Sequence, residues 1–110
     1  MVVPSSGEVV VVPFPFSDLS QNKVRPAVCL ASAGRGDWIL CQITSFAYGD
    51  PDAISISAPD FSSGGLAAVS FIRPGKLFTA NEGLLIRSVG ILNPSAIARL
   101  KTAVVTIIQR

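Results

Sequence analysis

Histidine is absent from all 110 residues of the sequence. This absence excludes ribonuclease chemistry based on paired histidines, Ser-His-Asp and Cys-His triads, and most zinc sites. Charge is also scarce, because 15% of the residues are charged and the formal net charge is only +2. So weak a positive charge does not hold nucleic acid by itself, and any phosphate binding must therefore be local.

Cysteine and long apolar runs are scarce as well. Cys29 and Cys41 lie within apolar stretches, and the chain does not open with a basic segment, an apolar run and a cleavage site. We therefore expect two reduced core thiols in a cytoplasmic protein. No apolar run approaches the roughly 20 residues of a transmembrane helix, so we expect no contact with a membrane.

Apolar residues, in contrast, make up 49% of the sequence. This composition is too apolar for a disordered chain, and a chain of this size buries roughly 60 to 70% of its exposable surface on folding. We expect one domain over residues 1–110. Its surface should be partly apolar and covered by a second copy or another partner.

Turn residues recur at the spacing of short strands, which predicts a small, mainly β barrel. A β-branched run over Glu8–Val12 predicts the first strand, and two prolines end it. The loops are predicted over Phe14–Lys23 and Ala58–Gly65, and a turn over Arg73–Lys76. The other predicted strands are Val24–Ser32, Trp38–Phe46, Ala53–Ser57, Leu66–Ile72 and Leu84–Leu92.

The turn Gly34-Arg35-Gly36 predicts a hairpin of the second and third strands. Centred on Arg35, the turn places Arg25 opposite Ser45, whereas a slip of one residue places Arg25 opposite Thr44. Either register brings a hydroxyl close to the arginine, because directly opposed side chains start about 5 Å apart.

The end of the chain changes character and predicts a helix. Asn93 is a good N-cap and Pro94 suits the first helical position. Apolar residues then recur at a spacing that gives the helix one apolar face, at Ile97, Leu100, Val104, Ile107 and Ile108.

Three stretches together resemble the MazF/PemK toxin family, and their order and spacing match it across nearly the whole chain. The resemblance implies an SH3-like barrel of the MazF/CcdB plasmid-maintenance-toxin type with a C-terminal helix. It also implies a homodimer that cleaves single-stranded RNA sequence-selectively and is inhibited by a cognate antitoxin protein. The stretches are Gly7–Val10 with Pro15–Asp18 and Lys23–Val28, then Gln42–Ser45, then Ser70–Phe78 with Val89–Leu92.

RNA can be cut without a metal or cofactor when its own 2'-hydroxyl attacks the adjacent phosphorus and leaves a 2',3'-cyclic phosphate. Arg25 is the first candidate catalytic residue, because a guanidinium donates two hydrogen bonds to phosphate and stays charged. Thr44, with Ser45 as a further candidate, would donate a hydroxyl hydrogen bond to the same group. The general base stays open among Glu8, Asp18, a water, or no specific group.

Further candidates for RNA binding are basic and aromatic side chains in loops. Each has an alternative role, since basic residues are often solvated and phenylalanines often pack in the core. Phe46 shares this ambiguity, and Asp50, Asp52 and Asp60 are better explained as turn residues than as a metal site. The candidates are Arg73, Lys23, Lys76, Phe14 and Phe16.

A second function is compatible with the same barrel. The chain could be a catalytically silent protein that binds an antitoxin or a topoisomerase, since one fold serves several functions. The lack of histidine removes a group that some members of the resembled family carry among the residues discussed for catalysis.

Overall fold

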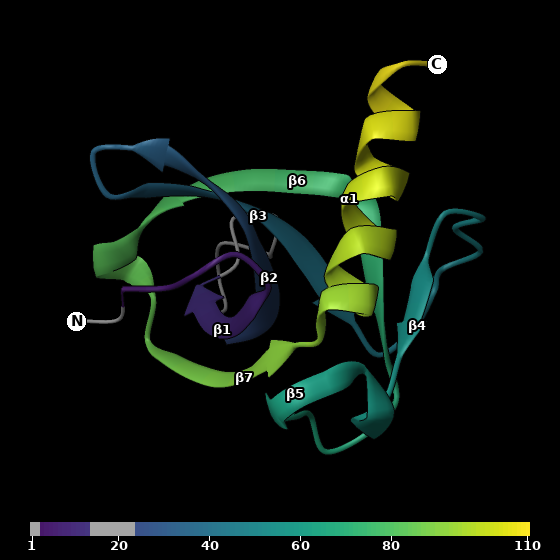
Figure 1. The fold of residues 1–110 in the computed structure, drawn as a ribbon, viewed down its shortest axis with the longest axis horizontal. Helices are drawn as coiled ribbons and strands as arrows, with labels where there is room; N and C mark the ends of the chain where they lie inside the picture. The colour runs from purple at the N-terminus through teal and green to yellow at the C-terminus, as the bar shows by residue number, and fades with distance from the viewer. Residues whose placement is uncertain (1–2, 14–23) are drawn as a thin grey trace.

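The computed structural model describes residues 3–13 and 24–110, which form seven strands and one α-helix (Figure 1). Two short 3-10 turns, Ala58–Asp60 and Glu82–Leu84, connect strands. The helix is α1, Pro94–Ile108. The strands are β1 (Glu8–Pro13), β2 (Val24–Gly34), β3 (Asp37–Thr44), β4 (Ile54–Ile56), β5 (Phe61–Gly64), β6 (Ser70–Asn81) and β7 (Arg87–Leu92).

The strands form one antiparallel sheet in the order β4-β6-β3-β2-β1-β7-β5. Figure 1 shows this sheet curled around β1 and β2, with α1 standing against its β6 side. The predicted mainly β barrel with a C-terminal helix is confirmed. The antiparallel pairing of β2 and β3 places the start of β2 next to the end of β3.

Both faces of the central strands are buried, which explains why β1 and β2 are almost continuously apolar. Side chains alternate between the two faces of a strand, so Val9 and Val28 enter one core cluster while Val10 and Ala27 enter the other. The first cluster also contains Leu100 of α1. The helix therefore closes one side of the curled sheet.

The register of β2 against β3 changes along the hairpin. Val28 lies opposite Cys41 and Ala27 opposite Gln42, and irregularities between Cys29 and Ala31 and between Ser32 and Gly34 shift the pairing closer to the turn. The register that sets Arg25 opposite Ser45 is therefore wrong at this end of the hairpin. The pairing of Ala27 with Gln42, continued by two residues, sets Arg25 opposite Thr44, the alternative that a slip of one residue allows.

The predicted turn at Arg73–Lys76 is wrong, because these residues lie inside β6. On either side of them β6 pairs with β3, with Leu77 opposite Cys41 and Ile72 opposite Ile43. The extra residues form an irregularity in the ladder, which accommodates Pro74, since proline has no N–H to donate. Pro74 itself is buried.

Other boundaries also differ from those expected. The expected loop Ala58–Gly65 contains a 3-10 turn and β5, which pairs with β7. The expected strand Leu66–Ile72 begins only at Ser70, and the expected strand Leu84–Leu92 begins at Arg87, after a 3-10 turn. Polarity alone does not distinguish a loop from a short edge strand such as β5.

The predicted helix is confirmed. Asn93 caps it by accepting a hydrogen bond from the backbone N–H of Ala96 (2.9 Å), and Pro94 occupies the first turn. Its first half is packed on the sheet. The second half is more open, with Val105 50% and Ile108 70% exposed. None of the helices in the described ranges is long and apolar enough to cross a membrane.

Candidate functional site

An open pocket of about 390 Å³ lies where β2 begins and β3 ends. Its described lining carries one guanidinium, three hydroxyl groups and three apolar side chains. The described residues that line it are Val24, Arg25, Pro26, Ile43, Thr44, Ser45 and Ser70. Three of these, Arg25, Thr44 and Ser45, are candidates that the sequence predicts.

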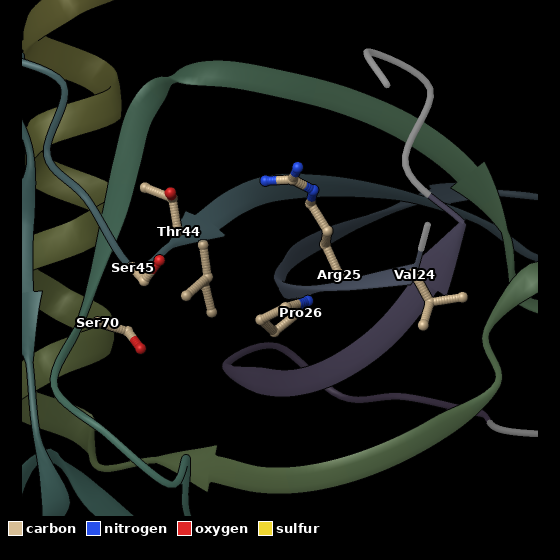
Figure 2. Close-up of a pocket in the computed structure, with 7 residues that line it drawn as sticks. Val24, Arg25, Pro26, Thr44, Ser45 and Ser70 are labelled. Carbon is tan, nitrogen blue, oxygen red and sulfur yellow. The ribbon is translucent and has the colours of Figure 1, made fainter. Parts of the chain in front are cut away.

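Arg25 and Thr44 face the same space from neighbouring strands. Figure 2 shows the Arg25 side chain extending from β2 with its guanidinium turned to the side where Thr44 ends β3. Arg25 is partly exposed, whereas Thr44 is only 5% exposed. A cation at the mouth of a pocket and a hydroxyl in its wall suit the binding of a phosphate-sized anion.

The Thr44 hydroxyl is fixed by the chain that follows it. Its Oγ1 accepts a hydrogen bond from the backbone N–H of Phe46 at 3.3 Å. This contact orients the side chain at the point where β3 ends and the chain turns away. Because the oxygen accepts this bond, the hydroxyl hydrogen can donate to a bound group.

Ser45 and Ser70 are the other two hydroxyl residues of the described lining. Ser45 is exposed, and Ser70 at the start of β6 donates from its Oγ to the backbone carbonyl of Ala68 at 3.1 Å. Sequence reasoning did not find Ser70, because only the pairing of β6 with the other side of β3 brings it to the pocket. Ser70 begins the Ser70–Phe78 stretch of the resemblance, which does not by itself mark this hydroxyl as part of a site.

The structure does not bring Arg73 into the described lining of this pocket. Its Nε donates to Asp50 Oδ2 at 3.1 Å, and its guanidinium carbon lies 5.4 Å from the centre of the Tyr48 ring. The pKa of Asp50 is lowered, first by a hydrogen bond from the backbone N–H of Asp52 (2.9 Å) and then by Arg73. The guanidinium is thus engaged within the protein.

The other candidates lie elsewhere. Lys76 is an exposed residue of β6. Glu8 begins β1 and accepts hydrogen bonds from the backbone and hydroxyl of Ser5 at 3.1 and 3.3 Å. Since Val12 is the β1 residue opposite Arg25, Glu8 lies roughly 13 Å farther along the strand and is poorly placed as a base. Four candidates fall outside the described residues: Lys23, Phe14, Phe16 and Asp18.

The two thiols take no part in the pocket. Cys29 and Cys41 are free and buried, as expected, and burial raises the pKa of each to about 12. Cys41 Sγ donates to the backbone carbonyl of Arg73 at 2.8 Å. In residues 3–13 and 24–110, no group of three or more Cys, Asp or Glu side chains is placed to hold a metal ion.

Solved structures of toxins share this architecture over their whole length. MazF from Deinococcus radiodurans has a TM-score of 0.76 at 19% identity, with 100% of each chain covered. An endoribonuclease from a mycobacterial species, solved in complex with its cognate antitoxin, has a TM-score of 0.75 at 14% identity, covering 97% of this chain and 96% of its own. The Mycobacterium tuberculosis toxin MazF-mt6 has a TM-score of 0.71 at 18% identity, with 93% and 96% covered. These likenesses define the fold as that of the MazF toxins.

The sequence itself gives the family. Residues 5–108 match the PemK-like, MazF-like toxins of type II toxin-antitoxin systems, and the chain belongs to this family. No curated protein sequence matches it significantly.

Proposed function

We propose that this toxin-family protein is an endoribonuclease that cleaves single-stranded RNA in the pocket formed by Arg25 and Thr44. The observation that carries the proposal is the placement of one permanent cation and a buried hydroxyl on facing sides of a single open pocket. The solved relatives that are described as endoribonucleases support the same activity.

The chemistry follows from what these groups can donate. The ribose 2'-oxygen attacks the adjacent phosphorus, the bond to the 5'-oxygen breaks, and a 2',3'-cyclic phosphate forms. Negative charge on the phosphoryl oxygens increases during this step. Arg25 stabilises that charge with its two parallel N–H donors, and Thr44 adds a hydroxyl donor.

Arg25 does not remove the proton from the 2'-hydroxyl in this scheme. A guanidinium with a pKa above about 12 is protonated at every physiological pH and is a poor base. The described lining of the pocket contains no carboxylate. Water therefore takes the proton from the 2'-hydroxyl and supplies the proton that the leaving 5'-oxygen takes up, while alignment and charge stabilisation supply the rate increase.

The test is cleavage of a long single-stranded RNA in excess chelator. Arg25→Ala and Thr44→Val should each lower the cleavage rate by about 100-fold or more, the usual effect of removing one oxyanion donor. Thr44→Ser keeps the hydroxyl and should retain most activity. Arg35→Ala is the matched control, because Arg35 lies just past the end of β2 opposite to Arg25, and should cleave like the wild type. Equal rates in wild type and Arg25→Ala would reject the proposal.

The protein partners we propose are a second copy of this chain and a cognate antitoxin, in the cytoplasm. An apolar groove of about 300 Å³ runs between the exposed half of α1 and the sheet. Such a surface is usually covered in solution. We assign it to the second copy. The described residues that line it are Leu30, Ala31, Ile39, Leu77, Lys101, Val104, Val105 and Ile108.

Light scattering tests the assignment of the groove. Ile108→Asp should convert a dimer to a monomer, because it places a charge in the apolar contact. Val69→Asp, at a site that is 54% exposed and outside the groove, should leave the dimer intact. A dimer that survives Ile108→Asp excludes this surface as the contact between copies.

A further inference from the structure

Two aromatic side chains stand in solvent directly after the pocket. Phe46 is 66% exposed and Tyr48 is 62% exposed, although large aromatic side chains usually bury most of their surface. Their ring centres are 6.2 Å apart with an angle of 62° between the planes, an edge-to-face pair. The pair therefore presents aromatic surface next to Thr44 and Ser45.

The Tyr48 ring is held in place by a set of contacts. The Arg73 guanidinium lies 5.4 Å from the ring centre and is tied to Asp50, and Asp50 in turn accepts the Asp52 backbone N–H at 2.9 Å. The Asp50 backbone N–H donates to the Ala47 carbonyl at 2.9 Å and closes the turn. An exposed ring with this much support beneath it is ordered before any ligand arrives.

The backbone of Tyr48 is itself unusual. Its φ angle is 55°, in the left-handed region that non-glycine residues seldom adopt. Strained backbone of this kind persists where surrounding contacts hold it, and it occurs often at binding sites. A glycine or asparagine would relieve the strain at this position. The turn alone therefore does not explain why a tyrosine occupies it.

The distance to the pocket suits one nucleotide of an RNA strand. Phe46 lies two residues beyond Thr44, so their Cα atoms are at most about 7 Å apart. Its backbone N–H holds the Thr44 hydroxyl, which links the aromatic pair to the pocket wall. A phosphate at Arg25 would therefore leave an adjoining base within reach of the rings.

We propose that Phe46 and Tyr48 form a stacking subsite for one unpaired nucleobase next to the phosphate bound by Arg25. The subsite rests on the proposed function, because it needs RNA in the pocket. Aromatic rings stack on any base but only when that base is free of a helix, so the subsite would favour single strands. Arg73 is a positioning residue that acts through Tyr48.

The probe is a fluorescently labelled 2'-O-methyl oligonucleotide copied from a site that the wild type cleaves, since blocking the 2'-oxygen prevents cleavage. Anisotropy gives the Kd for each variant. Phe46→Leu and Tyr48→Leu keep apolar bulk but lose the ring, and each should weaken binding by about 5- to 100-fold. Tyr48→Phe keeps the ring and should bind within twofold of the wild type. Ile86→Ala is the control, at an apolar site that is 53% exposed and outside the subsite.

A second arm uses the wild-type protein and does not depend on any variant folding. One base at a time is removed from the oligonucleotide. A single abasic position should weaken binding by the wild type by at least about 5-fold. The same position should cost Tyr48→Leu less than it costs the wild type, because losing the base and losing one of its two rings remove overlapping interactions.

The outcomes separate the two proposals. If Phe46→Leu and Tyr48→Leu bind within twofold of the wild type while Arg25→Ala loses binding, the subsite is wrong and the proposed function stands. The subsite is equally overturned if no abasic position weakens wild-type binding. If the wild type cleaves no RNA, the proposed function is rejected, and the subsite that rests on it is rejected with it.

Discussion

Arg73 donates its Nε–H to Asp50 Oδ2 at 3.1 Å, with the two side chains only 19% and 13% exposed. The Arg73 cation on β6 is thus neutralised by a carboxylate in the turn that follows β3. An arginine paired with a carboxylate adds little to the attraction of RNA phosphates. Arg25 has a different role in the proposed function, where it binds the phosphate. This difference can be measured, because each phosphate neutralised by the protein releases counterions and contributes to the salt dependence of binding.

We expect the double variant Arg73→Gln with Asp50→Asn, which leaves the net charge unchanged, to bind the oligonucleotide more weakly with the same dependence on salt. Arg25→Ala should reduce the slope of log Kd against log salt by about 0.7, the contribution of one phosphate in a single strand. Anisotropy titrations between low and moderate salt give both slopes. If the slope falls equally in Arg25→Ala and in the double variant, Arg73 also binds a phosphate.

The pH dependence of stability should report the Asp50 contacts. The pKa of Asp50 is lowered by the backbone N–H of Asp52 and by Arg73, so the folded protein favours the ionised carboxylate. The stabilisation is present above the ordinary aspartate pKa of about 4 and is lost as the pH falls through the lower folded value. Asp50→Asn should therefore cost about 1 kcal/mol at pH 7, and the difference from wild type should close below about pH 4. Urea unfolding across this range tests it. If the difference in unfolding free energy between the wild type and Asp50→Asn stays constant with pH, the charge of Asp50 contributes nothing to stability.

The buried thiols should be unreactive in the folded protein. A pKa of about 12 for Cys29 and Cys41, raised by burial, leaves roughly a thousandfold less thiolate at pH 8 than an ordinary thiol would have. The protein should therefore react with a thiol reagent at pH 8 only at its unfolding rate, and at once in urea. Rapid labelling of native protein would show that the core opens around these residues.

Raised pKa values of the two thiols also mean that the free energy of unfolding falls as the pH rises above about 8.5.

Much of the fold was readable from the sequence because local signals agreed with the tertiary structure. The β-branched run of β1, the turn around Arg35 and the cap at Asn93 each have one favoured outcome, and the structure adopts it. The turn predicted at Arg73–Lys76 is wrong, although Pro-Gly normally marks a turn. In the fold the same residues form an irregularity inside a long strand, which only the pairing with β3 determines.

The pocket was partly predictable for the same reason. Arg25, Thr44 and Ser45 belong to one hairpin, so a turn and a count of residues bring them together. Ser70 and Tyr48 could not be found in this way. The first arrives from the far side of β3, and the second gains its position from Arg73, which lies 25 residues away along the chain.

The close approach of β5 and β7 gives a matched pair of glycine variants. A Cβ at Gly90 would lie 2.7 Å from the Ser63 carbonyl oxygen and 2.8 Å from the Gly65 nitrogen, whereas at Gly75 the nearest atom is the Ile107 Cδ1 at 4.0 Å. Gly90→Ala should destabilise the protein by about 1 to 3 kcal/mol, because backbone must move. Gly75→Ala should be neutral or slightly stabilising. Equal unfolding midpoints for the two variants would mean that β5 is not held against β7 as described.

The most direct measurement concerns the ribose oxygen at the cut. A single-stranded RNA that the wild type cleaves is compared with the same RNA carrying one 2'-deoxy sugar on the 5' side of the cut, in excess chelator. We expect the all-ribose strand to yield a 2',3'-cyclic phosphate end and the substituted strand to stay intact at that bond while it still binds. Cleavage of the deoxy-substituted bond at the normal rate would contradict attack by the 2'-hydroxyl and with it the proposed role of Arg25 and Thr44.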